Sequence, residues 1–305
     1  MKFKQIIWLT FTILCMMFGL LRAEKIGDIE GLSKPSDLAL DAERIYVVDG
    51  AEVHILGKMR LNQLARFGKQ GEGPREFLLG RSGRGVFVFP RKDRVFVNSV
   101  GKISYFGFDG TFINAFPTGS GSRAARFQPY GDRFISMALE TSSSENDFGF
   151  YLSILDRNLK PVRIVQKLPF IRQGRLEFPV VRPEYRAYRD KIILLDTQAD
   201  AIKVFSGEGN KTDVIRLKLN KIEMTRQYKE RVFQFFKTNP LTRDRYEMLK
   251  KLIRFKNQFP MIQNFWVADD RIYIQTFMER DEKYAFYICR LDGEILGKRF
   301  IPVQY

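Results

Sequence analysis

The 305-residue chain carries 51 Lys and Arg against 35 Asp and Glu, and its formal net charge is +16. This length fits one large β domain or two ordinary domains. The one histidine, His54, excludes a metal centre built from several histidines, and the sequence has no Gly-x-Ser-x-Gly segment to supply a serine nucleophile.

The N-terminus has the layout of a secretory signal peptide. Lys2 and Lys4 precede the apolar run Ile6–Leu21, and Arg22-Ala23 leads into a polar chain. We therefore expect residues 1–23 to be a signal peptide and the protein to be exported to the periplasm or the extracellular space. The alternative is an uncleaved membrane anchor formed by residues 6–21, which is short for a hydrocarbon core about 30 Å thick.

Removal of this segment leaves a chain that is still strongly basic. A positive field of this kind attracts anionic partners, such as glycans, lipid headgroups or acidic proteins. Because the protein is expected to leave the cytoplasm, we expect no nucleic-acid partner. The alternative interpretation is that the charge mainly provides solubility.

A short phrase recurs five times along the chain. An acidic residue and a basic residue are followed by an apolar strand, at Glu43–Val47, Asp93–Val97, Asp132–Ile135, Asp190–Leu194 and Asp270–Ile274. Asp-Gly pairs between apolar runs, at Asp109-Gly110 and Asp292-Gly293, predict β-hairpins after two of the copies. Four antiparallel strands per unit, repeated about every 40–50 residues, predict an all-β propeller as one domain over residues 24–305.

Residues 224–256 interrupt the β pattern. Thr225 can cap a helix that Asn239-Pro240 ends, and Thr242 can cap a second helix. We expect an inserted α-helical hairpin that packs on the propeller through an apolar side. That side consists of Tyr228, Val232, Phe236, Leu249 and Ile253.

The same region concentrates positive charge. Residues 211–256 contain fourteen Lys and Arg against five Asp and Glu. We predict that its basic side rims one end of the propeller channel and binds an anionic envelope partner, a glycan or a protein. The predicted binding residues are Arg231, Arg243, Arg245, Lys250 and Arg254. The alternative is a solvated face of amphipathic helices.

A glycine-rich segment, Phe67–Phe77, follows the first copy of the phrase. Its structural residues are Gly68, Gly71, Gly73, Pro74 and Phe77. A phosphate-binding loop would need a following helix and a Lys-Ser/Thr pair, and the pair is missing. The segment is therefore interpreted as a crossover between two blades, with Phe77 in the core.

This segment resembles the six-bladed β-propeller proteins of bacterial envelopes, which are relatives of the NHL-repeat family. Their equivalent stretch usually reads Gly-Pro-Gly-Glu-Phe, whereas Arg75 replaces the last glycine here. The resemblance covers most of residues 30–300. It implies six blades, which we prefer, although the five phrases keep five blades possible.

The fold leaves the function open. We favour an exported binding or scaffold protein without catalytic activity and without a cofactor. The alternative is a propeller hydrolase or lyase of the lactonase type with a carboxylate-bound metal in the central channel. Calcium is the possible metal, and Asp49, Asp196 and Asp269 are its candidate ligands near strand ends.

Overall fold

The computed structural model describes residues 27, 29–80, 85–118, 126–140, 149–169 and 176–302. The predicted signal peptide, residues 1–23, and the alternative anchor, residues 6–21, lie outside the described residues. No helix in the described part of the chain is long and apolar enough to cross a membrane.

The described residues form a β-propeller of five four-stranded antiparallel blades, with the strands in sequence order within each blade. The first blade has β1 (Pro35–Leu40), β2 (Arg44–Asp49), β3 (Glu52–Gly57) and β4 (Gln63–Phe67), and the second has β5 (Phe87–Pro90), β6 (Val95–Ser99), β7 (Lys102–Phe106) and β8 (Phe112–Pro117). The third has β9 (Arg126–Tyr130), β10 (Arg133–Glu140), β11 (Gly149–Leu155) and β12 (Pro161–Pro169). The fourth has β14 (Glu184–Tyr188), β15 (Lys191–Asp196), β16 (Ala201–Ser206) and β17 (Lys211–Ile215), and the fifth has β19 (Asn264–Ala268), β20 (Arg271–Arg280), β21 (Lys283–Arg290) and β22 (Ile295–Pro302).

The repeated phrase marks the same place in every blade. Its basic residue lies at or just before the start of the second strand, as Arg44 does in β2 and Lys191 does in β15. The predicted Asp-Gly hairpins join the third and fourth strands, where the Asp109 carboxylate accepts the backbone N–H of Thr111 at 2.9 Å. The prediction of a propeller built from four-stranded units is confirmed.

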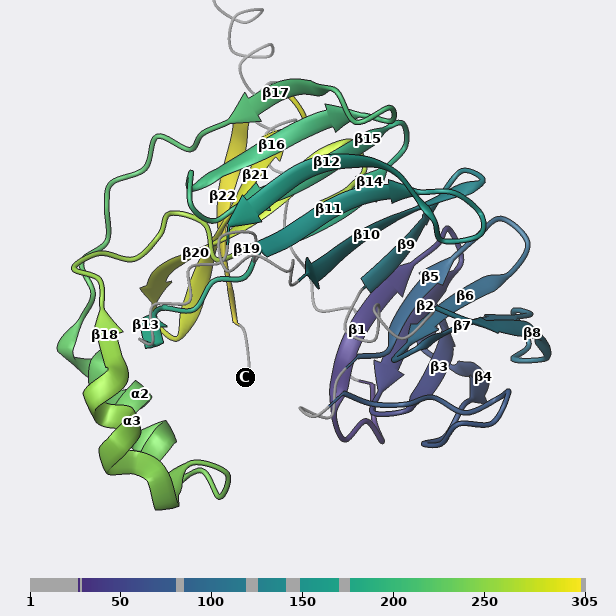
Figure 1. Ribbon diagram of the computed structural model, residues 1–305, viewed down its shortest axis with the longest axis horizontal. Helices are drawn as coiled ribbons and strands as arrows, with labels where there is room; N and C mark the ends of the chain where they lie inside the picture. Colours follow the sequence, from purple (N-terminus) through teal and green to yellow (C-terminus); the bar gives the residue numbers. More distant parts are fainter. Residues whose placement is uncertain are drawn as a thin grey trace, which may run out of the picture.

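The blades stack through alternating apolar residues. On β2, Tyr46 and Val48 face the second blade and pack with Val95 and Val97 of β6. The first strands lie at the centre, where β1 packs on β5, β5 on β9, β9 on β14 and β14 on β19. Figure 1 shows the result as an arc, with β1 near one end and the blade of β19–β22 at the other.

Five blades match the five copies of the phrase. A sixth blade, which the family resemblance implied, is not formed by the residues that the structure describes. The position between the fourth and fifth blades in the sequence is taken instead by the helical insertion. The described residues therefore support a propeller with five blades.

The insertion contains helix α2 (Arg226–Thr238), the 3-10 turn η3 (Arg243–Arg245) and helix α3 (Tyr246–Leu252). Thr225 caps α2 as predicted, because its hydroxyl accepts the N–H of Tyr228 at 3.2 Å. The prediction that Thr242 caps the second helix is wrong for its side chain: Thr242 stands at the N-cap position of η3 but makes no capping hydrogen bond. Its hydroxyl instead donates back to the carbonyl oxygen of Phe236 at 2.9 Å, and α3 starts at Tyr246, after η3.

The insertion joins the propeller through a short parallel sheet. Strand β18 (Ile253–Phe255) follows α3 and pairs with β13 (Leu176–Phe178), which precedes the fourth blade. Neither helix contains a buried residue. The helices therefore form an arm that extends away from the blades, as Figure 1 shows in green at the lower left.

Candidate functional site

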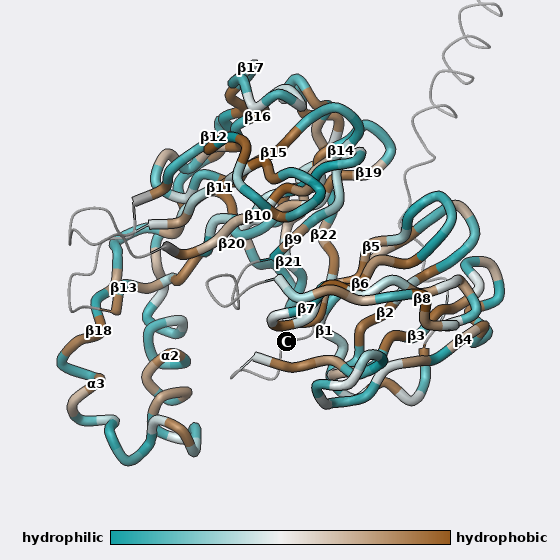
Figure 2. Tube along the Cα trace, turned by 45° about the vertical axis from the view of Figure 1, so that its right-hand side comes forward, coloured by the Kyte–Doolittle hydropathy of each residue, from teal (hydrophilic) through white to brown (hydrophobic). Residues whose placement is uncertain are grey.

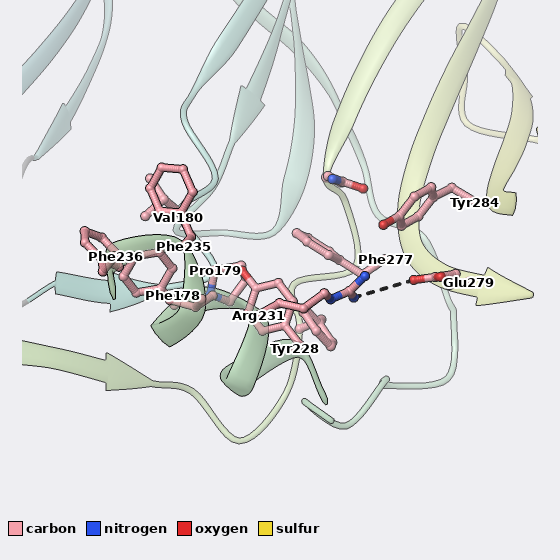
Figure 3. A pocket seen from close by; sticks show the side chains of 13 residues that line it. Phe178, Pro179, Val180, Tyr228, Arg231, Phe235, Phe236, Phe277, Glu279 and Tyr284 are labelled. Atoms are coloured by element: carbon pink, nitrogen blue, oxygen red, sulfur yellow. Dashed lines mark ion pairs between the residues drawn. The ribbon is translucent and has the colours of Figure 1, made fainter. Parts of the chain in front are cut away.

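A pocket of about 470 Å³ lies between helix α2 and the fifth blade. Its walls are mainly aromatic and come from α2, from β13 and the segment after it, from the segment between β18 and β19, and from β20 and β21. The lining residues include Phe178, Pro179, Val180, Tyr228, Val232, Phe235, Phe236, Phe259, Phe277 and Tyr284. Figure 3 shows the labelled side chains around the opening. A concave, mostly apolar pocket with few polar groups is the usual form of a small-ligand site.

Two chains of aromatic rings connect the arm to the propeller. Tyr228 of α2 meets Phe259 edge to face at 4.9 Å between ring centroids, and Phe259 stacks on Phe277 at 4.7 Å. On the other side, Phe236 meets Phe178 edge to face at 5.8 Å. Because such ring pairs prefer defined geometries, they fix the position of α2 over the pocket.

One ion pair crosses the pocket. The Arg231 guanidinium lies 3.8 Å from the Glu279 carboxylate, and the two side chains are 56% and 39% exposed. The dashed line in Figure 3 marks this pair. A long, exposed pair of this kind contributes little to stability. The guanidinium can therefore exchange Glu279 for an anionic group of a ligand.

The structure separates the five predicted binding residues. Only Arg231 lines the pocket. Arg243, Arg245 and Lys250 lie exposed on the arm. The Arg254 guanidinium donates to the carbonyl oxygens of Lys251 and Ile253 at 2.8 Å, so it stabilises the end of α3. The five predicted residues therefore do not line this pocket together.

The glycine-rich segment crosses from the first blade to the second. Phe77 is fully buried in the core between them. Gly68 has a φ of +92°, and a Cβ there would overlap the Phe77 ring and lie 2.8 Å from the carbonyl oxygen of Ala51. Only glycine fits this close approach.

A lysine and a glutamate hold the rest of this loop. The Lys102 ammonium donates to the carbonyl oxygens of Gly73 at 2.6 Å and Glu76 at 2.7 Å. The Glu76 carboxylate accepts the N–H of Gly73 at 2.9 Å. Burial lowers the pKa of Lys102, although nearby Glu76 opposes this shift. The carbonyl oxygens of Gly73 and Glu76, the N–H of Gly73 and the Glu76 carboxylate are thus used in hydrogen bonds that hold the loop.

An ionic network lies at the centre of the propeller. Arg126 of β9 reaches Glu184 of β14 at 3.2 Å and Asp37 of β1 at 4.0 Å. Arg186 shares Glu184 at 2.9 Å, and the Arg126 guanidinium also lies 4.5 Å from the Phe87 ring centroid. Residues from β1, β5, β9 and β14 thus converge here.

Burial perturbs two members of this network. It raises the pKa of Asp37 above its ordinary value, and the charge of Arg126 and the N–H of Val88 oppose that rise. Burial likewise lowers the pKa of Arg186, helped by repulsion from Arg126. Both carboxylates are engaged by arginines, so the network ties the first strands together.

Sequence reasoning missed this network, although a signal exists. Asp37 lies six residues before Glu43, and Arg126 lies six residues before Asp132. Glu184 stands six residues before Asp190 in the fourth blade. Because the phrase fixes the register of each blade, residues at this offset occupy equivalent positions on the first strands, near the propeller axis.

The three acids considered as calcium ligands do not converge. The Asp49 carboxylate accepts the backbone N–H groups of Ser33 and Lys34. The Asp196 carboxylate accepts the backbone N–H groups of Gln198 and Ala199, both at 3.0 Å. Asp269 lies in the turn before β20 with a φ of +49°. Within the described residues, no group of three or more His, Cys, Asp or Glu side chains is arranged to hold a metal ion.

Replacing Asp196 by asparagine is expected to reduce stability by about 1.5–3 kcal/mol at neutral pH, since its buried carboxylate binds the Lys203 ammonium at 2.7 Å. Burial favours the neutral acid, but Lys203 and two backbone N–H groups outweigh it and lower the pKa of Asp196 below 3.8. A lowered pKa stabilises the fold above the ordinary value, and this stability is lost as the pH falls through the folded-state pKa. Urea denaturation should therefore show a difference between parent and variant that shrinks toward pH ~3.

The control for this experiment is Asp292→Asn. Asp292 is an exposed turn residue whose carboxylate accepts one N–H, that of Glu294 at 3.0 Å. Its replacement should cost less than about 0.5 kcal/mol. A cost at Asp196 that equals the control, or that does not change with pH, would contradict the role given to this carboxylate.

The histidine and Cys289, the cysteine within the described residues, have structural roles. His54 of β3 is buried, with Nδ1 3.3 Å from the Gln63 amide oxygen and Nε2 3.7 Å from the Glu52 carboxylate. Cys289 of β21 is buried in the core between the fourth and fifth blades, and burial raises the pKa of its thiol to about 11. A protonated, buried thiol is unreactive.

Comparison with known proteins supports the fold. No protein-family profile and no curated protein matches the sequence. The chain is similar in structure to a protein of Bacteroides fragilis NCTC 9343 assigned as exported, at TM-score 0.52 and 12% identity over 90% of this chain and 73% of that one. It is also similar to a DUF4221 family member from Bacteroides vulgatus ATCC 8482, at TM-score 0.50 and 11% identity over 89% and 82% of the two chains. At these identities the likeness shows a shared propeller fold and no more.

Proposed function

We propose that this propeller is an exported, non-catalytic binding protein whose ligand enters the pocket between α2 and the fifth blade. The ligand is an anionic component of the envelope that presents an apolar or aromatic group. The observation that carries the proposal is the aromatic pocket with Arg231 at its edge. The aromatic walls would bind the apolar group, and the Arg231 guanidinium would pair with the negatively charged group.

The composition of the walls favours an apolar anchor over a sugar. Ten of the thirteen lining residues are aromatic or aliphatic, counting Pro179 and the two tyrosines, and the others are Arg231, Gln263 and Glu279. A bare sugar needs many hydrogen-bonding partners when it is buried, because each unsatisfied hydroxyl costs free energy. An acidic amphiphile or peptide with an aromatic or aliphatic anchor satisfies the pocket better.

Two further observations support export and binding. The apolar run Ile6–Leu21 behind Lys2 and Lys4 favours export, and one protein of similar fold is itself assigned as exported. His54 contacts Gln63 and Glu52 in the first blade. Within the described part of the chain, its ring nitrogens contact no serine or cysteine, which favours binding over triad chemistry.

Anilinonaphthalene sulfonate is a suitable probe, because it joins aromatic rings to a fixed negative charge and fluoresces when its rings leave water. We expect saturable binding at one site on the exported form of the protein. Val232→Trp should remove this binding, since the indole would fill the space beside Phe277. Arg231→Glu should weaken it by about tenfold, which is the loss of roughly 1.4 kcal/mol.

Arg226→Glu is the matched control. Arg226 lies on the same helix with its side chain 92% exposed and pairs with Glu230 at 2.7 Å, outside the pocket. This variant should bind the probe within about twofold of the parent, because exposed charges far from the ligand act weakly. If Val232→Trp binds the probe as well as the parent does, the pocket is not the ligand site.

A further inference from the structure

The outer part of the arm leaves large apolar side chains in solvent. Leu241 is 87% exposed, Met248 is 54% exposed, and Leu252, in the last turn of α3, is 36% exposed. Met248 and Leu252 are four residues apart on α3 and so lie on one face of that helix. Such a concentration of exposed apolar residues indicates a surface that a partner covers.

The same arm is strongly basic. Residues 225–252 contain eight Lys and Arg against three Asp and Glu, a net charge of +5. Arg243 and Arg245 are exposed in η3, and Lys250 and Lys251 are exposed in the last turn of α3. Figure 2 shows hydrophobic and hydrophilic stretches alternating along both helices. Basic residues beside exposed apolar ones are the composition of elements that lie on membrane surfaces.

The turn between the helices lies at the end of the arm away from the sheets (Figure 1). Leu241 is part of this turn. Hydrogen bonds hold this turn in place. The N–H of Leu241 donates to the Asn239 side-chain oxygen at 2.9 Å, and the Thr242 hydroxyl donates to the carbonyl oxygen of Phe236 at 2.9 Å. Leu241 is thus exposed by an ordered turn between basic residues on both sides, Lys237 and Arg243.

We propose that the outer end of the arm docks on a lipid bilayer that contains anionic lipids. Leu241, with Met248, enters the boundary between headgroups and acyl chains, and Arg243 and Arg245 contact lipid phosphates. An anionic polysaccharide matches the charge but offers no apolar phase for these side chains, whereas a bilayer matches both. This docking goes beyond the ligand pocket and does not depend on it.

Co-sedimentation with vesicles tests the proposal, using the exported form with its N-terminus determined by mass spectrometry. We expect binding to vesicles of phosphatidylcholine with phosphatidylglycerol, and weaker binding to phosphatidylcholine alone. The variants Leu241→Ser/Met248→Ser and Arg243→Glu/Arg245→Glu should each bind at least about tenfold more weakly than the parent. Because all four residues are exposed, these changes should leave the fold intact.

Matched controls carry the same kinds of change on the blades. Met59→Ser/Ile113→Ser replaces apolar side chains that are 89% and 48% exposed, and Lys160→Glu/Lys211→Glu reverses two exposed charges. Both controls, and the pocket variant Val232→Trp, should bind vesicles like the parent. The proposal is overturned if either arm variant binds like the parent or if the blade controls lose binding equally. Equal binding to both vesicle types would also overturn it, as would binding to an anionic polysaccharide alone.

Discussion

Replacing Phe77 by alanine is expected to lower the free energy of unfolding by about 3–5 kcal/mol. The Phe77 ring is fully buried and meets Phe106 edge to face at 5.8 Å and Phe67 at 6.4 Å. It fills the space between the first and second blades under the glycine-rich crossover. Truncation would leave a cavity that the backbone at Gly68 cannot fill without rearranging the loop.

Urea denaturation followed by circular dichroism measures this loss. The control is Phe235→Ala, which makes the same change on the arm at a side chain that is 55% exposed. We expect the control to cost less than about 1 kcal/mol, since little apolar area is returned to water. Equal costs at the two positions would contradict the assignment of Phe77 to the blade interface.

Replacing Arg126 by methionine is the second large effect, with an expected loss of about 3–5 kcal/mol at neutral pH. Methionine keeps apolar volume over the Phe87 ring but removes the cation paired with Asp37, and both ionic side chains are more than four-fifths buried. The more weakly acting charge of Arg186 would then be left to offset the buried Asp37 carboxylate. Removing one partner of a buried pair costs more than the pair itself contributes.

The free energy of unfolding that Arg126→Met loses should increase as the pH rises. Burial already raises the pKa of Asp37 in the folded protein, against the opposing charge of Arg126. A raised carboxyl pKa contributes stability that is present below the ordinary value and lost as the pH rises through the folded-state pKa. Without Arg126 this pKa rises further, so the stabilities of parent and variant should approach each other as the solution is acidified.

The control for the network is Arg290→Met. Arg290 forms a pair with Glu294 at 2.6 Å, but both side chains are more than half exposed. The same substitution there should cost less than about 1 kcal/mol at any pH. A small or pH-independent loss at Arg126 would show that the network does not hold the first strands together.

The blades could be predicted from the sequence because their signals are local. The phrase at Asp93 and the turn at Asp109-Gly110 each define a strand end within a few residues, and the structure has strands at both places. The phrase count also agrees with the five blades. The family resemblance suggested one blade more, because the motif that carries it, the crossover at Phe67–Phe77, identifies a junction between two blades and does not count them.

The arm was harder to predict in detail. The periodicity of Tyr228, Val232 and Phe236 indicated a helix and its apolar side, and the structure places these residues at the pocket. Periodicity does not reveal what an apolar side packs against. Since no helical residue of the arm is buried, the expected close packing on the propeller is replaced by a few ring contacts.

The pocket itself could not be predicted from the sequence. Its walls come from Phe178, from α2, from Phe259 and from Phe277 and Tyr284. These segments are distant in the sequence, and long-range contacts such as the pairing of β13 with β18 bring them together. A three-residue parallel pairing between distant segments leaves no periodic signal. The basic cluster lies in the same part of the chain as α2, and of its predicted binding residues only Arg231 lines the pocket.

The most direct test is a crystal structure of the protein grown with anilinonaphthalene sulfonate. We predict density for its rings among Tyr228, Val232 and Phe277, with the sulfonate beside the Arg231 guanidinium in place of Glu279. Density for the probe at the central network around Arg126, with the pocket beside α2 empty, would contradict the proposed ligand site.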